Sequence, residues 1–220
     1  MTDQINRSRV HAAAEIAFVV LCVLIAEWVV IPIFGRRKSV GMIPVLIVFV
    51  FGFLSHKARR EGAREIGFSR HNFVPALRLL ILWMIPAAIA LLTVGWFTGG
   101  LHFSPPRNWS NFALSQFWLF VWGLMQQYAL QAIVNRRTQE IWGRGVVSVI
   151  LVALLFCALH FPNLWLMVAT LAGGILWAAI YQRYPNLYAL AVSHSIMTTV
   201  LASSISPDVL HGLRVGYNYF

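Results

Sequence analysis

Long apolar runs, separated by short polar or basic stretches, dominate the pattern of this chain. Most of the runs approach the 20 or so residues that an α-helix needs to cross a lipid bilayer. Proline, glycine and arginine residues mark the places where the runs end. We therefore expect an all-α fold, a polytopic transmembrane helical bundle of about seven spans. The expected spans cover residues 12–34, 40–55, 73–97, 112–134, 145–160, 164–181 and 187–205.

Composition supports a membrane protein. Of the 220 residues, 59% are hydrophobic and only 11% are charged, and the mean hydropathy is +0.72. A soluble domain carries about a quarter charged residues, so a chain this apolar could not cover a water-facing surface. With no long linker and no fixed-period repeat, residues 1–220 are expected to form one integral membrane domain. The first apolar run is too long for a signal-peptide core and reads as an uncleaved span.

The basic residues predict an orientation rather than a nucleic-acid partner. The net charge is +10, but the arginines lie in short loops between apolar runs, where they orient spans and bind lipid headgroups. The N-terminal tail and the loops that share its side hold eleven Lys and Arg residues, whereas the opposite set holds five, including Arg36, Arg37 and Lys38. The positive-inside rule therefore predicts a cytoplasmic N-terminus, and the polar tail to Phe220 is expected to be disordered or to lie on the surface.

Three amides in the fourth run are the first candidates for function. Gln126, Gln127 and Gln131 lie in the apolar stretch Trp122–Arg137. Amides in a membrane helix usually face other helices or a water-filled cavity, and Gln127 and Gln131 share one helix face. The structural alternative is that all three hold the bundle together by hydrogen bonds. None of them can take up a proton at physiological pH, so none is a general base.

Two histidines and one acid also lie in or beside apolar runs. His160 closes the fifth span, and His194 lies inside the seventh with Thr198 one turn later on the same face. Ionisable groups within a membrane are functional hypotheses, although a capping or structural role would also explain each histidine. Glu27 lies in the middle of the first span, where it could be a proton carrier or a carboxylate that faces the histidines. The structural alternatives are a partner for Arg78 or a neutral, protonated acid.

Other polar groups carry less information. Glu15 and Glu140 are close to span ends and are expected at the membrane interface. Two histidines without a third ligand at a recognisable spacing do not make a zinc site, so no metal and no cofactor is expected. Small residues recur at four-residue spacing in the sixth span, at Ala169 and Gly173 and again at Gly174 and Ala178. This pattern predicts close helix packing and nothing chemical.

The order of the polar groups resembles that of the membrane-embedded CAAX prenyl endopeptidase and bacteriocin-processing family, often called CPBP. The family pattern is a Glu-Glu pair followed four residues later by Arg, then Phe-x-x-x-His, then His-x-x-x-Asn. The second motif is intact as Phe156 to His160, followed by Asn163, and the third is present as His194 with Thr198 in place of asparagine. The resemblance covers residues 112–202. It implies a CPBP-like intramembrane-protease fold in the bacterial inner membrane.

The first motif departs from the family pattern. Gln126 and Gln127 stand at the two glutamate positions, and Gln131 stands at the arginine position. In the family the first glutamate is thought to activate water for attack on a peptide bond, while the histidines and the asparagine hold the water and stabilise the oxyanion. Because loss of one partner would leave an uncompensated buried charge, the three substitutions are mutually consistent. They predict a retained pocket without its standard base.

The leading hypothesis is therefore a pseudoprotease or weak enzyme that binds a lipidated or hydrophobic peptide, or a membrane protein, beside membrane lipid. The expected pocket residues are Gln126, Gln127, Gln131, His160, His194 and Thr198, with Phe156, Asn163 and Glu27 around them. Hydrolysis with Glu27 or a histidine as base ranks second. A proton-coupled transporter or lipid-binding protein is the alternative class, and a scaffold without a pocket is the simplest one.

One geometric difficulty accompanies the pocket hypothesis. At 1.5 Å per residue, His160 would lie about 22 Å from the inner side and His194 only about 10 Å from it. The two histidines can meet only if the fifth span is tilted or offset, or begins as an interfacial helix. Histidines that lie far apart would refute the pocket.

Overall fold

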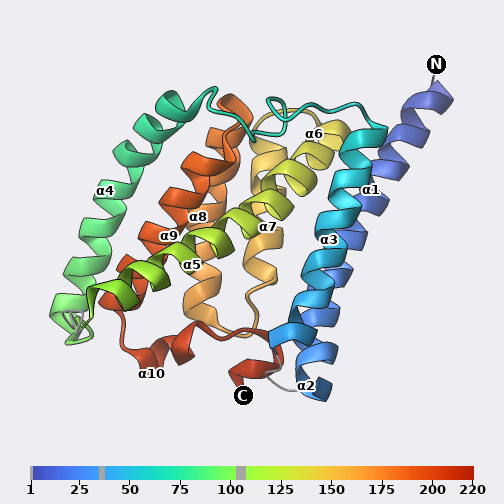
Figure 1. Cartoon of the computed structure of the whole chain (residues 1–220). Coiled ribbons are helices and arrows are strands. Elements are labelled where there is room, and N and C mark those ends of the chain that lie inside the picture. The colour runs from blue at the N-terminus through green and yellow to red at the C-terminus, as the bar shows by residue number, and fades with distance from the viewer. Residues whose placement is uncertain (1, 35–37, 103–107) are drawn as a thin grey trace.

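The computed structural model describes residues 2–34, 38–102 and 108–220, and this part of the chain contains helices and no strands. Long helices lie side by side, and one continuous helix crosses obliquely between them (Figure 1). The fold is therefore the expected all-α bundle. Arg36, Arg37 and Arg107, on which part of the orientation argument depends, lie outside the described residues.

The N-terminal part forms two neighbouring helical columns. The first runs without a break from α1 (Thr2–Ile25) through a π-helix, η1 (Ala26–Val30), to α2 (Ile31–Phe34). It therefore begins ten residues before the expected start at residue 12, because the polar residues ahead of the apolar run continue the helix. Beside it lies α3 (Lys38–Ala58), close to the expected 40–55 (Figure 1).

The oblique helix is the largest departure from the expected spans. It consists of α5 (Trp109–Gln127), a π-helix, η2 (Tyr128–Asn135), and α6 (Arg136–Trp142). The Asn108 side chain caps its start by accepting hydrogen bonds from the backbone N–H groups of residues 110 and 111. The expected end at residue 134 is wrong, because the helix continues through Arg136 and Arg137 for two more turns. A π-helix inside an α-helix often marks a functional site, and η2 begins directly after Gln127.

The remaining helices follow the predicted boundaries closely. They are α4 (Phe73–Thr98), α7 (Val146–Ala158), α8 (Leu164–Arg183) and α9 (Leu187–Ser204). The Asn163 and Asn186 side chains cap α8 and α9. A Cβ on Gly174 would lie 3.0 Å from the Cα of Ala153, which explains the small-residue spacing on α8 as close packing against α7.

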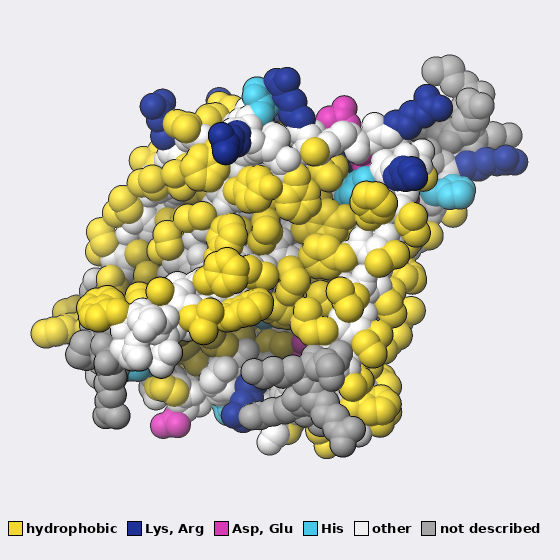
Figure 2. Space-filling model, viewed as in Figure 1, with side chains coloured by type: hydrophobic (Ala, Val, Ile, Leu, Met, Phe, Trp, Pro, Cys, Tyr) yellow, Lys and Arg dark blue, Asp and Glu magenta, His cyan; other side chains and the backbone are white. Residues whose placement is uncertain are grey.

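Four helices are long and apolar enough to cross a membrane: Asn6–Phe34, Phe73–Thr98, Leu164–Arg183 and Leu187–Ser204. The apolar helices Met42–Ala58 and Val146–Ala158 are shorter, and the expected span 112–134 does not meet this criterion, so the count of about seven is not exact. Hydrophobic side chains cover most of the visible face, whereas Lys and Arg gather toward the end that holds the N-terminus (Figure 2). The protein is thus an integral membrane protein.

The C-terminal tail is ordered, contrary to one of the two expectations. It forms α10 (Pro207–Leu210) and two 3-10 turns, η3 (His211–Leu213) and η4 (Gly216–Tyr219), and it runs along the end of the bundle opposite the N-terminus (Figure 1). Leu210 is only 2% exposed and packs against Leu166 and Leu201. Burial of this apolar side chain anchors the tail to the bundle.

Candidate functional site

His194 and Gln127 meet in the interior of the bundle. The Gln127 side chain is fully buried, and its amide Nε2 donates a hydrogen bond of 3.1 Å to His194 Nδ1. An accepting Nδ1 carries no proton, so the neutral imidazole holds its proton on Nε2. Gly123 lies one turn before Gln127. A Cβ at this position would lie 3.4 Å from the His194 Cβ, so the glycine lets α5 and α9 approach each other closely here.

Aromatic rings fix the orientation of the His194 ring. Trp177 on α8 stacks on it with a centroid distance of 4.7 Å and an interplanar angle of 11°. The Trp177 indole N–H donates to Ser193 Oγ at 2.8 Å, which fixes the tryptophan in turn. Phe156 on α7 meets His194 edge to face at 6.4 Å. Three helices besides α9 thus hold one imidazole.

His160 is also in contact with Phe156. Its ring meets the Phe156 ring edge to face at 4.7 Å, and its Nδ1 donates to the Phe156 carbonyl at 2.7 Å. The two histidines therefore share one aromatic neighbour, so the depth difference expected from straight spans does not separate them. Gln126 is half-buried on the same helix as Gln127. Within the described chain, Thr198 makes no hydrogen bond with His194.

Gln131 belongs to a buried amide cluster that sequence reasoning missed. Its Oε1 accepts a 2.7 Å hydrogen bond from Asn135 Nδ2, and Asn135 Oδ1 accepts from Gln182 Nε2 at 3.1 Å. Gln182 Nε2 also donates to Ser148 Oγ at 2.9 Å. The cluster ties η2 to α7 and α8. The four-residue spacing of Gln131 and Asn135 was a signal for the first pair, whereas Gln182 and Ser148 join only in three dimensions.

Two atoms near this region have no hydrogen-bond partner in the described chain. They are Gln127 Oε1, an acceptor, and Gln131 Nε2, a donor, and both are buried. A buried polar group without a partner costs free energy, and so few are left unpaired in folded proteins. The pair presents one acceptor and one donor on successive turns of the same helix.

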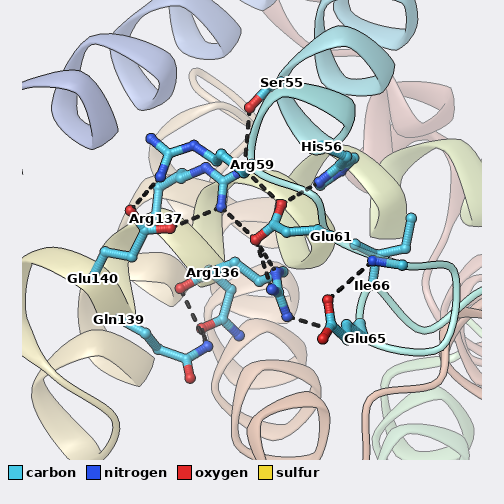
Figure 3. A network of polar contacts seen from close by, with 12 residues as sticks. Ser55, His56, Arg59, Glu61, Glu65, Ile66, Arg136, Arg137, Gln139 and Glu140 are labelled. Carbon is cyan, nitrogen blue, oxygen red and sulfur yellow. Dashed lines mark hydrogen bonds and ion pairs between the residues drawn. The ribbon is translucent and has the colours of Figure 1, made fainter. Parts of the chain in front are cut away.

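A charged network lies at the end of the bundle that holds the N-terminus (Figure 3). Its centre is Arg137, which is fully buried and whose five N–H groups all donate hydrogen bonds. The acceptors are Glu15 on α1, Ser55 on α3, Glu61 in the following loop and Glu140 on α6. Glu15 and Glu140 were expected simply at the interface. Both are also partners of a buried arginine, which sequence reasoning did not predict.

The network also lowers the pKa of Glu61. Burial alone would raise the pKa of Glu61, but hydrogen bonds with Arg137, His56 and Arg136 outweigh burial and hold that pKa well below its usual range. Arg59 and Arg136 complete the ion pairs, with Arg136 Nη2 2.6 Å from Glu61 Oε1. Three arginines thus balance three glutamates at this end of the bundle.

Glu27 lies at the opposite end, inside the π-helix η1. Among the described residues it makes no ion pair with Arg78, and it contacts the C-terminal tail, since a Cβ on Gly216 would lie 2.7 Å from the Glu27 Cβ. Gly216 N–H donates to the Phe161 carbonyl at 2.9 Å, and Trp28 stacks on Phe161 at 6.3 Å. Glu27 therefore lies close to the corner that follows His160. Within the described residues, no group of three His, Cys, Asp or Glu side chains could hold a metal ion.

A comparison with protein families now identifies this arrangement. The model of the type II CAAX prenyl endopeptidase Rce1-like family matches residues 118–200, which include every motif position named above. Over this region the protein matches the CAAX-protease family. The family predicted from the motifs is thereby confirmed. No curated protein and no solved structure matches the chain. The described contacts of Gln127, His160 and His194 are thus those of a CAAX-protease-family region.

Proposed function

We propose that this CAAX-protease-family protein is a pseudoprotease, which keeps the family pocket for binding and lacks the standard base. The observation that carries the proposal is the buried hydrogen bond from Gln127 Nε2 to His194 Nδ1. Gln127 stands at the second glutamate position of the family motif, and Gln126 stands at the first, which the resemblance gives to the base. Neither amide can accept the proton of an attacking water. Hydrolysis by the family mechanism is therefore expected to be weak or absent.

The chemistry of the pocket fits a peptide ligand. A peptide group offers one N–H donor and one C=O acceptor, which complement the unpaired Gln127 Oε1 and Gln131 Nε2. The surrounding helices are apolar, so a peptide with a hydrophobic or lipidated end would reach the pocket from the membrane. The ligand class is a hydrophobic-tailed or lipidated membrane peptide, or a membrane protein that presents such a segment.

The proposed location is the bacterial inner membrane, with the N-terminus in the cytoplasm. Contacts from Arg59 to Glu140 and from the Asn186 side chain to the carbonyls of Ser69 and His71 bring the basic connections to one end of the bundle. Lys and Arg gather toward that end (Figure 2). The positive-inside rule assigns such an end to the cytoplasm.

The test is a cleavage assay in membranes with a prenylated or hydrophobic-tailed reporter peptide. It compares the wild type with His194→Ala and with a triple variant, Gln126→Glu, Gln127→Glu and Gln131→Arg, which restores the family motif. A pseudoprotease predicts a silent wild type and cleavage by the triple variant. Cleavage by the wild type that disappears in His194→Ala would show a protease with a different base.

Glu27 gives the second candidate, a hydrolase with a relocated base. It is a carboxylate near the corner next to His160, and a carboxylate can accept a proton from water where glutamine cannot. If wild-type cleavage occurs and Glu27→Gln abolishes it, this candidate replaces the first. Proton movement into vesicles that depends on Glu27, without cleavage, would instead indicate the proton-coupled transporter.

A further inference from the structure

The corner between α7 and α8 already holds a peptide segment, namely the chain's own C-terminal segment, residues 206–220. Asn163 is 1% exposed, and its Nδ2 donates to two backbone carbonyls of this segment, Leu210 O at 2.8 Å and Arg214 O at 3.0 Å. The Phe161 carbonyl accepts from Gly216 N–H at 2.9 Å. All three bonds involve main-chain groups of the segment. The corner therefore holds the segment by its peptide backbone, and the buried Leu210 side chain adds a sequence-dependent anchor.

The segment also makes a close steric contact with η1. Gly216 has φ +57°, a conformation that glycine adopts easily, and a Cβ there would lie 2.7 Å from the Glu27 Cβ. Gly212 has a similar φ of +59°, but the nearest atom to its Cβ would be 3.9 Å away. The segment is thus fitted between Glu27 on one side and Phe161 and Asn163 on the other.

We propose that Asn163 and Phe161 form a docking site for peptide backbone, which the C-terminal segment occupies until a membrane peptide displaces it. The two residues lie one and three positions beyond His160, so a peptide bound there would run toward the histidines. Displacement of the segment would at the same time uncover Glu27. This inference deepens the proposed pseudoprotease function by naming the site where its ligand enters.

The first experiment is hydrogen exchange of the backbone amides of residues 208–219 in the full chain in nanodiscs. Asn163→Asp removes both donated hydrogen bonds but keeps an oxygen to cap α8, where the wild-type Oδ1 accepts from Leu166 N–H. Loss of two hydrogen bonds should speed exchange of the segment roughly tenfold or more. Unchanged exchange would overturn the proposal.

Asn186→Asp is the matched control at the other end of the bundle. Asn186 likewise caps a helix, α9, and donates to two carbonyls, those of Ser69 and His71. The control should leave exchange of residues 208–219 unchanged. If it speeds that exchange as much as Asn163→Asp does, the effect is general loosening of the fold and the proposal fails.

Two glycine variants test the fit independently. Gly216→Ala and Gly212→Ala bear similar backbone strain, but only the former meets Glu27. The proposal expects markedly faster exchange of the segment in Gly216→Ala than in Gly212→Ala, and equal rates would contradict it.

Displacement is tested on the wild type with a synthetic peptide of residues 206–220. The peptide should compete for the corner and speed exchange of the resident segment, whereas a scrambled peptide should not. No response to either peptide, or an equal response to both, would refute displacement. Because the readout is exchange of the segment alone, such a failure leaves the pseudoprotease proposal to be decided by the reporter-peptide assay.

Discussion

Replacement of Arg137 is the perturbation for which the structure gives the clearest magnitude. Arg137 is fully buried, and its five N–H groups donate to Glu15, Ser55, Glu61 and Glu140. Arg137→Met keeps much of the side-chain volume but leaves acids with fewer positive partners. Removal of one partner from a buried ion pair costs about 3–5 kcal/mol. The Glu140 side chain is 30% exposed, so water screens its charge and its ion pair contributes less to this loss of stability.

Lysine at the same position separates charge from geometry. Arg137→Lys keeps the positive charge but offers three donors in place of five, so at least two hydrogen bonds are lost. We expect a smaller loss of stability than for Arg137→Met, because lysine keeps the positive charge that balances the buried acids.

The assay for both variants is equilibrium unfolding in detergent micelles or nanodiscs, followed by tryptophan fluorescence. Arg183→Met is the control, since Arg183 is exposed and its guanidinium lies only over the Tyr184 ring at 5.5 Å. The control should change the free energy of unfolding by less than about 1 kcal/mol. An Arg137→Met variant as stable as the control would refute the reasoning that this network holds α1 and α3 to α6.

Three further predictions concern packing, pH and the support of His194. Gly95→Ala should destabilise the fold by about 1–3 kcal/mol, because its Cβ would overlap the Ser204 carbonyl oxygen, whereas Gly62→Ala, which meets nothing within 4 Å, should be near neutral in the same unfolding assay. The pKa of Glu61 is lower in the folded than in the unfolded state, so ionised Glu61 should stabilise the fold above about pH 4, and this stabilisation should be lost as the pH falls further. Glu61→Gln should therefore reduce the change in the free energy of unfolding with pH. Trp177→Phe keeps a ring on His194 but loses the 2.8 Å hydrogen bond to Ser193, so the free energy of unfolding should fall by about 1–2 kcal/mol. In the double variant with Ser193→Ala, the loss should be smaller than the sum of the two single losses.

The helix boundaries could be predicted where local signals mark them. The expected 73–97 and 187–205 compare with Phe73–Thr98 and Leu187–Ser204, because asparagine or glycine lies directly beside these helices. The end of the oblique helix could not be predicted in this way. A double arginine after an apolar run usually marks the membrane edge, whereas Arg137 is buried by acids from α1 and from the loop after α3.

The same distinction applies to the candidate site. Motif order pointed to Gln127, His194 and Phe156 as pocket residues. In the structure Gln127 and His194 form a direct hydrogen bond, and Phe156 contacts both histidines, which motif order did not predict. The link from Asn135 to Gln182 and the contact of Glu27 with Gly216 depend on residues more than 40 positions apart in the chain. No local pattern encodes such contacts.

The central claim is that the pocket built around Gln127 and His194 binds a membrane peptide without cleaving it. The most direct test incubates the purified wild type in nanodiscs with a prenylated peptide, and then measures the mass of both the bound and the free peptide. Our account predicts that intact peptide is retained by the wild type and that His194→Ala weakens its retention. Accumulation of the hydrolysed products by the wild type would contradict the account.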